Sequence, residues 1–406
     1  MRQNALTLIC EVKKNELESL RLFLKDHQDR LKNQLRLLGT IHYCRWVIID
    51  EAILDGKTVS PQLAFSSNFD GNLDQHLNDL ILNLKDSLNQ IYSHCVDFDK
   101  DNLYKYLQSI RVKEMAFYQG SPGRSVKTIA QEKELRQYLF DIKNAGQWIG
   151  QSAISVHRQL QKKVFENENF SWAKQKIETP KVNWFGLIIF GIVALCIAPI
   201  LIVWAVYIQV FFERKDKPLG LTRNQLSDEH IQKMQLDEDF GFQNQFSQII
   251  EMKKGRSRLI TVNVLYLFTR ILIKILFVHG KLMGIPTIHF ARWVMVNNNR
   301  RMLFFSNFDG SWTQYLGDFI DKSGWGLTGI FGNTVNFPRA LFLVFKGAYN
   351  QQEFLAWSRN SQIATQLWYV DDPSQSIKNI NNNTLIRNEL SSNLNEKQAT
   401  LFLSRI

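Results

Sequence analysis

Cysteine is scarce in this sequence, and the short motifs of common enzyme classes are missing from it. Its four cysteines are Cys10, Cys44, Cys95 and Cys196, and no two of them form a CxxC pair. This arrangement argues against a zinc cluster or a disulfide framework, so we predict no metal site and expect reduced thiols. GxSxG, HExxH and P-loop motifs are missing, as is GxGxxG in a strand–helix context. Hydrolytic and phosphate-binding chemistry therefore has no support in the sequence.

A secretion signal is missing as well. The beginning of the chain contains an apolar run of only six residues, 5–10, which is shorter than the core of a signal peptide. We therefore expect the first part of the chain to stay in the cytoplasm.

The overall charge is basic, with a formal net charge of +11 and a pI of about 9.4. Such a balance suits either nucleic acid or an anionic membrane surface. The basic residues are dispersed or flank one long apolar segment, and no base-stacking motif accompanies them. We therefore expect a lipid bilayer as a partner and no nucleic acid.

Four sequence blocks occur twice, in the same order and 239 to 251 residues apart. The pairs are 9–14 with 249–254, 40–47 with 287–294, 67–71 with 306–310, and 117–127 with 368–378. Four ordered blocks at a nearly constant offset indicate an internal duplication.

Each copy has the pattern of a βαββαβ unit, which is ferredoxin-like. The predicted strands are 6–13, 41–50, 63–69 and 114–118 in the first copy, and 246–253, 288–296, 302–308 and 365–370 in the second. The main predicted helices are 15–38, 125–142 and 376–391. We therefore predict an α+β fold of two tandem ferredoxin-like modules that pack sheet to sheet as a dimeric α/β-barrel.

The predicted domain organisation follows from these patterns. The first module is 1–145, a linker helix is 146–181, a membrane-inserted segment is 182–212 and a second linker is 213–240. The second module is 241–392, and a flexible tail is 393–406.

The segment 182–212 contains no charged residue over 31 positions, against the roughly 20 that cross a bilayer as a helix. Pro199 lies near its middle, and both flanks are basic. We predict a hairpin that enters and leaves on one side, which places both modules on the cytoplasmic face of the cell membrane. The alternative is one long tilted span with the modules on opposite faces.

A second apolar helix is predicted over 259–279. Its only charged residues are Arg270 and Lys274, four positions apart on one face. We interpret it as an interfacial helix whose apolar face enters lipid. The alternatives are a second span and an ordinary buried helix.

Three polar residues recur in both copies and are the candidate site residues: His42, Arg45 and Asp70, then His289, Arg292 and Asp309. Strand alternation places His and Arg on opposite faces unless a bulge intervenes. We expect each Arg to pair with the Asp at the end of the adjacent strand. This arrangement can be a structural clasp, or it can line an anion or cofactor pocket between the sheets.

The runs IHFARWV at 288–294, LFFSNFDGSW at 303–312, YLGDFIDK at 315–322, NTVNFPR at 333–339 and TQLWY at 365–369 resemble a bacterial family of membrane-associated proteins. That family is similar to the dye-decolorising-peroxidase-like group of ferredoxin-fold proteins. The resemblance implies a tandem dimeric α/β-barrel.

In the peroxidases of that group, an Asp of a GxxDG motif works with an Arg above haem, and a downstream His ligates the iron. The resemblance therefore makes Arg45, Asp70, Arg292 and Asp309 weak catalytic candidates, and His42, His157 and His289 weak haem candidates. Ser replaces the first Gly of the motif in both copies, and no His follows His289.

We therefore favour a membrane-anchored, non-catalytic protein that binds a small hydrophobic or anionic ligand or a lipid, or that acts as a scaffold. The alternative is a haem-dependent peroxidase. The sequence leaves the oligomeric state open.

Overall fold

The computed structural model describes residues 2–222, 225–236, 238, 241–278 and 280–406. The fold is α+β, and its main β-structure is two four-stranded antiparallel sheets that do not close into a barrel. Sheet 1 has the order β1 (Gln3–Glu11), β5 (Gln62–Asp70), β2 (Ile41–Ile49) and β12 (Leu367–Val370). Sheet 2 has the order β7 (Gln243–Glu251), β9 (Arg301–Asp309), β8 (Ile288–Val296) and β6 (Glu114–Gln119).

The predicted fourth strand of each copy lies in the sheet of the other copy. The chain at 110–112 first pairs with β1, where Val112 N–H donates to Thr7 O at 2.9 Å, and then continues into β6 beside β8. Ile363 N–H likewise donates to Ser247 O at 2.9 Å, before the chain reaches β12 beside β2. The prediction that residues 114–118 belong with the strands of the first copy was wrong for the sheet, because the chain leaves β1 after Val112 and pairs with β8 from Glu114 onwards.

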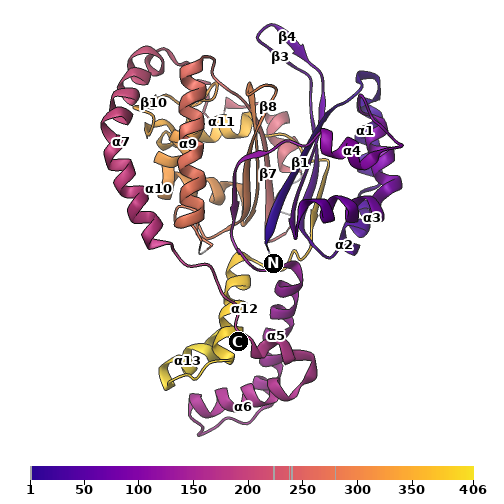
Figure 1. Cartoon of the computed structure of the whole chain (residues 1–406), viewed down its shortest axis with the longest axis vertical. Coiled ribbons are helices and arrows are strands. Elements are labelled where there is room, and N and C mark those ends of the chain that lie inside the picture. The colour runs from indigo at the N-terminus through magenta and orange to yellow at the C-terminus, as the bar shows by residue number, and fades with distance from the viewer. Residues whose placement is uncertain (1, 223–224, 237, 239–240, 279) are drawn as a thin grey trace.

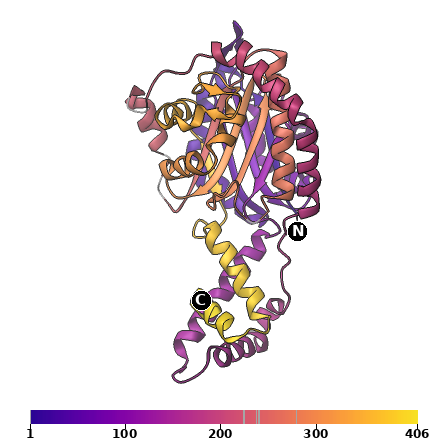
Figure 2. The same cartoon turned by 90° about the vertical axis from the view of Figure 1, so that its left-hand side faces the viewer.

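Helices cover the outer face of each sheet, as Figures 1 and 2 show. Outside sheet 1 lie α1 (Leu17–Asp26), α2 (Gln28–Leu37), α3 (Leu73–Ser93) and α4 (Leu103–Ser109). Outside sheet 2 lie α9 (Arg256–Ile275), α10 (Trp312–Phe331) and α11 (Gln351–Asn360). The inner faces meet in a separate cluster that includes Val47, Ala64, Val294 and Phe305. The helix predicted over 15–38 is two helices, because His27 leaves the helical conformation at φ −108° and ψ 16°.

Four helices form a stalk below the two sheets (Figure 1). They are α5 (Val126–Ala145), α6 (Ala153–Glu166), α12 (Ile377–Leu390) and α13 (Glu396–Arg405). The flexible tail predicted over 393–406 is therefore wrong for most of its length. Asn395 caps α13 through a capping box, and Phe402 is fully buried in the stalk core.

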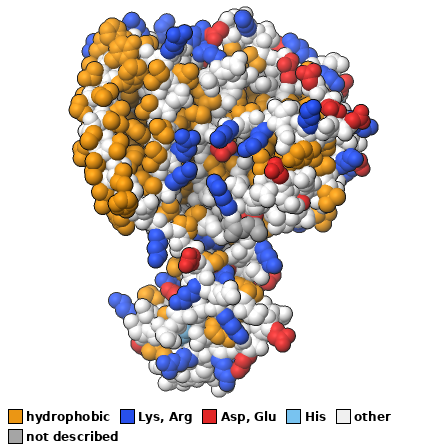
Figure 3. Space-filling model, viewed as in Figure 1, with side chains coloured by type: hydrophobic (Ala, Val, Ile, Leu, Met, Phe, Trp, Pro, Cys, Tyr) orange, Lys and Arg blue, Asp and Glu red, His pale blue; other side chains and the backbone are white. Residues whose placement is uncertain are grey.

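The apolar segment forms one continuous helix, α7 (Trp184–Phe211), with Pro199 inside it. The predicted hairpin was wrong, because the helix continues past the proline rather than reversing there. Its 28 residues extend about 42 Å at 1.5 Å per residue. The helix is long and apolar enough to cross a membrane. No residue in its most apolar stretch of 18 residues is buried inside the protein. Figure 3 shows its side chains as an apolar stripe along one edge of the body.

The remaining elements are short. They are β3 (Ala52–Leu54), β4 (Lys57–Val59), α8 (Asp228–Gln235), β10 (Ala340–Leu341), β11 (Phe345–Lys346) and the 3₁₀ turns η1 (Lys14–Glu16), η2 (Glu168–Lys174), η3 (Glu213–Lys215) and η5 (Gly347–Tyr349). The β3–β4 hairpin turns at the Asp55–Gly56 pair, where both residues have positive φ.

Candidate functional site

The two candidate arginines cross from one sheet to the other. Arg45 on β2 donates to Phe246 O, Ser247 Oγ and Ser306 O at 3.0 Å each. It also donates to the side chain of Asn307. Its partners are thus backbone and neutral groups of sheet 2, and the predicted pair with Asp70 was wrong.

Arg292 makes the reciprocal contacts with sheet 1. It donates to Leu6 O and Ser67 O at 2.7 Å each, to Thr7 Oγ1 at 3.2 Å and to the side chain of Asn68. Burial lowers the pKa of Arg292 to about 10, and burial with the nearby Arg292 charge lowers the pKa of Arg45 to about 9. Both arginines therefore stay protonated near neutral pH, and the sheets are joined by two buried cations.

The candidate aspartates bind the candidate histidines and the first turns of the stalk helices. His42 Nε2 lies 3.1 Å from Asp70 Oδ1, and Val126 N–H at the start of α5 donates to Asp70 Oδ2 at 2.7 Å. A carboxylate at a helix N-terminus accepts a free backbone N–H and is favoured by the helix dipole. The second copy repeats the arrangement, with His289 Nε2 2.7 Å from Asp309 Oδ1 and Ile377 N–H 2.9 Å from Asp309 Oδ2.

A bulge brings each histidine to the inner face of its sheet. The register of β2 shifts between Ile41 and Tyr43, and the register of β8 shifts at the equivalent place. As a result the ring of His42 lies 5.3 Å from the ring of Phe290 in the other sheet. Histidine and arginine thus share a face, which simple alternation does not predict.

The other positions of the repeated SNFDG block also have structural roles. Ser67 Oγ lies 2.8 Å from His76 Nε2, and the ring of Phe69 stacks on His76 at 3.7 Å. Gly71 adopts a φ of 100°, which favours glycine. In the second copy, Tyr315 donates to Ser306, Phe308 stacks on Tyr315 at 3.9 Å, and Gly310 has a φ of 84°.

The candidate haem residues do not form a haem site. His42 and His289 border an inter-sheet cavity of only about 30 Å³, which is much smaller than the cavity of about 150 Å³ that accommodates benzene. Their Nε2 atoms already lie against Asp70 and Asp309. His157 lies in the stalk, 3.1 Å from Glu389 O, and burial lowers its pKa. The geometry does not fit a haem, and the described residues contain no group of three His, Cys, Asp or Glu side chains that could hold a metal.

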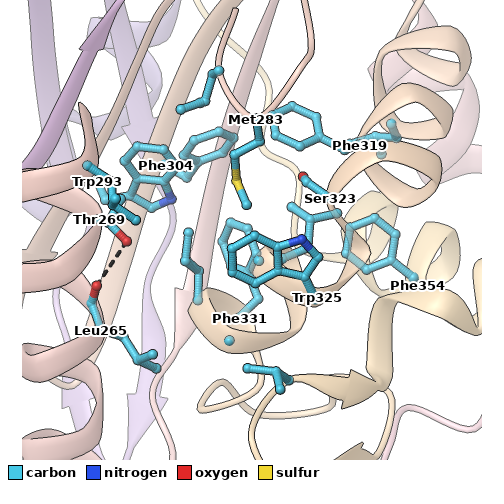
Figure 4. Close-up of a pocket in the computed structure, with 18 of the residues that line it drawn as sticks. Leu265, Thr269, Met283, Trp293, Phe304, Phe319, Ser323, Trp325, Phe331 and Phe354 are labelled. Carbon is cyan, nitrogen blue, oxygen red and sulfur yellow. Dashed lines mark hydrogen bonds between the residues drawn. The ribbon is translucent and has the colours of Figure 1, made fainter. Parts of the chain in front are cut away.

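A larger cavity, which sequence reasoning missed, lies on the other side of sheet 2 (Figure 4). Its volume is about 180 Å³, and its walls are sheet 2, α9, α10, α11 and one side chain of α7. The lining residues that are labelled in Figure 4 are Leu265, Thr269, Met283, Trp293, Phe304, Phe319, Ser323, Trp325, Phe331 and Phe354. The glycine-rich run 324–332, at the end of α10 and directly after it, was a signal of unusual packing at this place. No family model, curated protein or solved structure matches the chain, so its function has to be inferred from this geometry.

Proposed function

We propose that this is a membrane-anchored, non-catalytic protein that binds an apolar small molecule or lipid, and that α7 is its anchor. The observation that carries the proposal is the exposed apolar face of α7. Its exposed large apolar residues are Trp184, Phe185, Ile188, Ile189, Ile192, Val193, Leu195, Ile200, Ile202, Val203, Val206, Tyr207, Val210 and Phe211. A contiguous apolar surface of this kind indicates a membrane or protein interface.

Both ends of α7 are fixed to the body of the protein. At its beginning, Asn183 N–H donates to Ile275 O at the end of α9, at 2.9 Å. Near its end, Gln209 and Glu213 accept backbone N–H groups from Phe342 and Leu343 at 2.8 and 3.1 Å. The first contact places the beginning of α7 beside the end of α9, and the other two fix the end of α7 to the segment that contains Phe342 and Leu343.

The middle of α7 also contacts α9. Trp204 Nε1 donates to Thr261 Oγ1 at 2.9 Å, and the ring of Phe190 meets that of Phe268 edge to face at 5.7 Å. If α7 crossed the membrane, α9 would lie beside it at the depth of the hydrocarbon core. There the exposed Arg270 and Lys274 of α9 would each cost about 2.5–3.5 kcal/mol or more. We therefore propose that α7 lies in the plane of one leaflet.

Charge supports the same orientation. Exposed lysines precede α7 and exposed basic residues follow it: Lys174, Lys176, Lys181, Arg214, Lys215 and Lys217. A helix lying in the interface brings both groups to one layer of anionic head groups, and each such cation contributes about 1 kcal/mol. We propose the cytoplasmic leaflet of the cell membrane for this contact.

Vesicle flotation tests the anchor. The protein is purified in detergent, mixed with vesicles containing phosphatidylglycerol, and freed of detergent. We expect Leu195→Glu with Val203→Glu to lower vesicle binding at least about tenfold, because two charges would enter the apolar layer. The matched control is Leu82→Glu with Ile53→Glu, which alters equally exposed residues away from α7.

Two outcomes would overturn the anchor. One is wild-type protein that stays with the soluble fraction. The other is a stable dimer that forms without vesicles and that the α7 substitutions break, because a second copy would then cover α7.

We also propose that the two halves are copies of one ferredoxin-like module packed as a fused dimer. The repeated blocks support this, since they make equivalent contacts in both sheets. Trp368 pairs with Arg45 across β12 and β2, and Phe117 pairs with Arg292 across β6 and β8.

A further inference from the structure

Two hydrogen-bond donors that line the apolar cavity have no partner among the residues that the structure describes. Ser323 Oγ and Trp293 Nε1 are both buried, and no acceptor within the described part of the chain reaches either of them. Neighbouring polar groups are satisfied: Thr269 donates to Leu265 O at 2.9 Å (Figure 4), and Trp357 donates to Val335 O at 3.1 Å. A buried donor without a partner costs about 1–3 kcal/mol, which a ligand could recover.

The helix α10 is broken at the first of these donors. Ser323 has a φ of −148° and a ψ of 32°, outside the helical range. In Figure 4 its hydroxyl is on the side that faces Met283, another lining residue. A helix that departs from its regular geometry beside a cavity, with its hydroxyl unpaired, is typical of a ligand site.

The lining also defines which ligand the cavity accepts. None of its described residues carries a charge, and twelve of them are Phe, Trp or Tyr. An ionised ligand would be an unpaired charge in an apolar site, which is strongly unfavourable. The unpaired donors instead require an acceptor oxygen. A dry apolar cavity of about 150 Å³ accommodates benzene, so this one has room for one ring or a short chain segment.

We propose that the cavity binds a neutral apolar molecule through a carbonyl oxygen, which accepts hydrogen bonds from Ser323 and Trp293. This inference rests on the proposed anchor for the route of entry. Phe190 of α7 and Phe268 of α9 both line the cavity, so the wall between ligand and bilayer is the α7–α9 pair. The carbonyl compound arrives from the leaflet as a prenylquinone-like ring or as an acyl ester.

Competition binding tests the proposal on the full chain held in an amphipathic polymer. The displaced probe is fluorobenzene, followed by fluorine NMR, and the competitors are 2-hexanone, hexane and hexanoate, all of a size that a cavity of about 180 Å³ accommodates. We expect the ketone to bind more tightly than hexane by about 2- to 12-fold for each of the two hydrogen bonds, and hexanoate to bind most weakly. Ser323→Ala should reduce this preference by the value of one hydrogen bond and leave hexane binding unchanged. Benzoquinone and methyl hexanoate then distinguish the ring source from the ester source.

Two glycines of α10 give a matched pair of variants. A Cβ at Gly329, in the cavity wall, would meet Leu265 and Val344 at 3.8 Å, whereas a Cβ at Gly317 would meet nothing within 4 Å. Gly329→Leu should abolish binding of all competitors, and Gly317→Leu should not change it.

Equal binding of ketone and hexane by the wild type would overturn the proposal, as would an unchanged preference in Ser323→Ala. Vesicle flotation tests the membrane anchor independently of the cavity ligand. Vesicle binding without a ketone preference overturns the cavity ligand alone, and a ketone preference without vesicle binding overturns the anchor alone.

Discussion

At the scale of single residues, Arg45 and Arg292 make reciprocal contacts between the two sheets. The fully buried guanidinium groups of Arg45 and Arg292 have carbonyl and amide partners in the opposite sheet. A buried arginine can be satisfied in this way because its five donors fit several neutral acceptors at once. The sequence indicated that these arginines needed partners. It could not indicate which partners, because the amino-acid sequence of one strand does not show which residues of another sheet will lie opposite it.

A double-mutant cycle tests the assignment of Arg292. We expect Arg292→Ala to lower the free energy of unfolding by about 3 kcal/mol or more, because several buried acceptors lose their donor. Its coupling energy with Asn68→Ala should exceed about 1 kcal/mol, whereas coupling with Asp309→Ala should stay below about 0.5 kcal/mol. Urea unfolding measures both values. Strong coupling to Asp309 would instead support the pair expected from sequence.

The buried His76 predicts a dependence of stability on pH. Burial lowers its pKa in the folded protein to about 3, whereas the unfolded chain titrates near 6.5. As the pH falls, His76 is therefore protonated in the unfolded chain before it is protonated in the folded protein. The contribution of the neutral His76 to the free energy of unfolding is complete above pH 6.5. It declines as the pH falls towards 3, by up to about 1.4 kcal/mol per pH unit.

His76→Tyr introduces the residue that Tyr315 provides at the equivalent place in the second copy. This variant should lose that part of the pH dependence between pH 6.5 and 3, as measured by urea unfolding across the range. A slope identical to that of the wild type would show that His76 is not the group responsible.

At the scale of elements, sequence periodicity located most strands but not their partners. The predicted strand 288–296 is β8 with the same bounds, because a buried β-branched and aromatic run flanked by turn residues is a strong signal. The helix α13 was missed because only Ala399 and Phe402 of its ten residues are buried, while Leu401 is exposed. The cavity was missed because its lining comes from segments far apart in the chain, including Phe190 and Phe354.

The native Cys196 provides a test of how α7 lies in a membrane, if α7 is the anchor that we propose. It is exposed near the middle of α7, whereas Cys10, Cys44 and Cys95 are buried. A spin label on Cys196 should lie about 5–10 Å below the head groups if α7 lies in the interface. A spanning helix would place it near the midplane, about 15 Å deep. Relative accessibility to oxygen and to a polar nickel complex gives the depth, with Leu82→Cys as the aqueous control.

At the scale of the whole molecule, the exchange of β6 and β12 makes each sheet depend on the other half of the chain. Without the second half of the chain, sheet 1 lacks β12, which leaves the edge of β2 unpaired. Arg45 then also lacks its acceptors on β7 and β9. The stalk is shared in the same way, since α5 and α12 pack in one core. The repeated sequence blocks could not reveal in which sheet these two strands lie, because a strand has the same pattern in either sheet.

This dependence predicts how the first half behaves alone. The fragment 1–145 carries its own strand 114–119, which corresponds to β12. If the halves are copies of one module, two fragments should exchange these strands and form a symmetric dimer. In that dimer β6 of one copy would pair with β2 of the other, and Arg45 would donate to Leu6 O and Ser67 O of the partner copy, as Arg292 does in the full chain. Light scattering after size exclusion measures the mass, and Arg45→Ala should shift the fragment towards unfolded monomer. A folded monomeric fragment would contradict the exchange, because its β2 edge would then be stable without a partner.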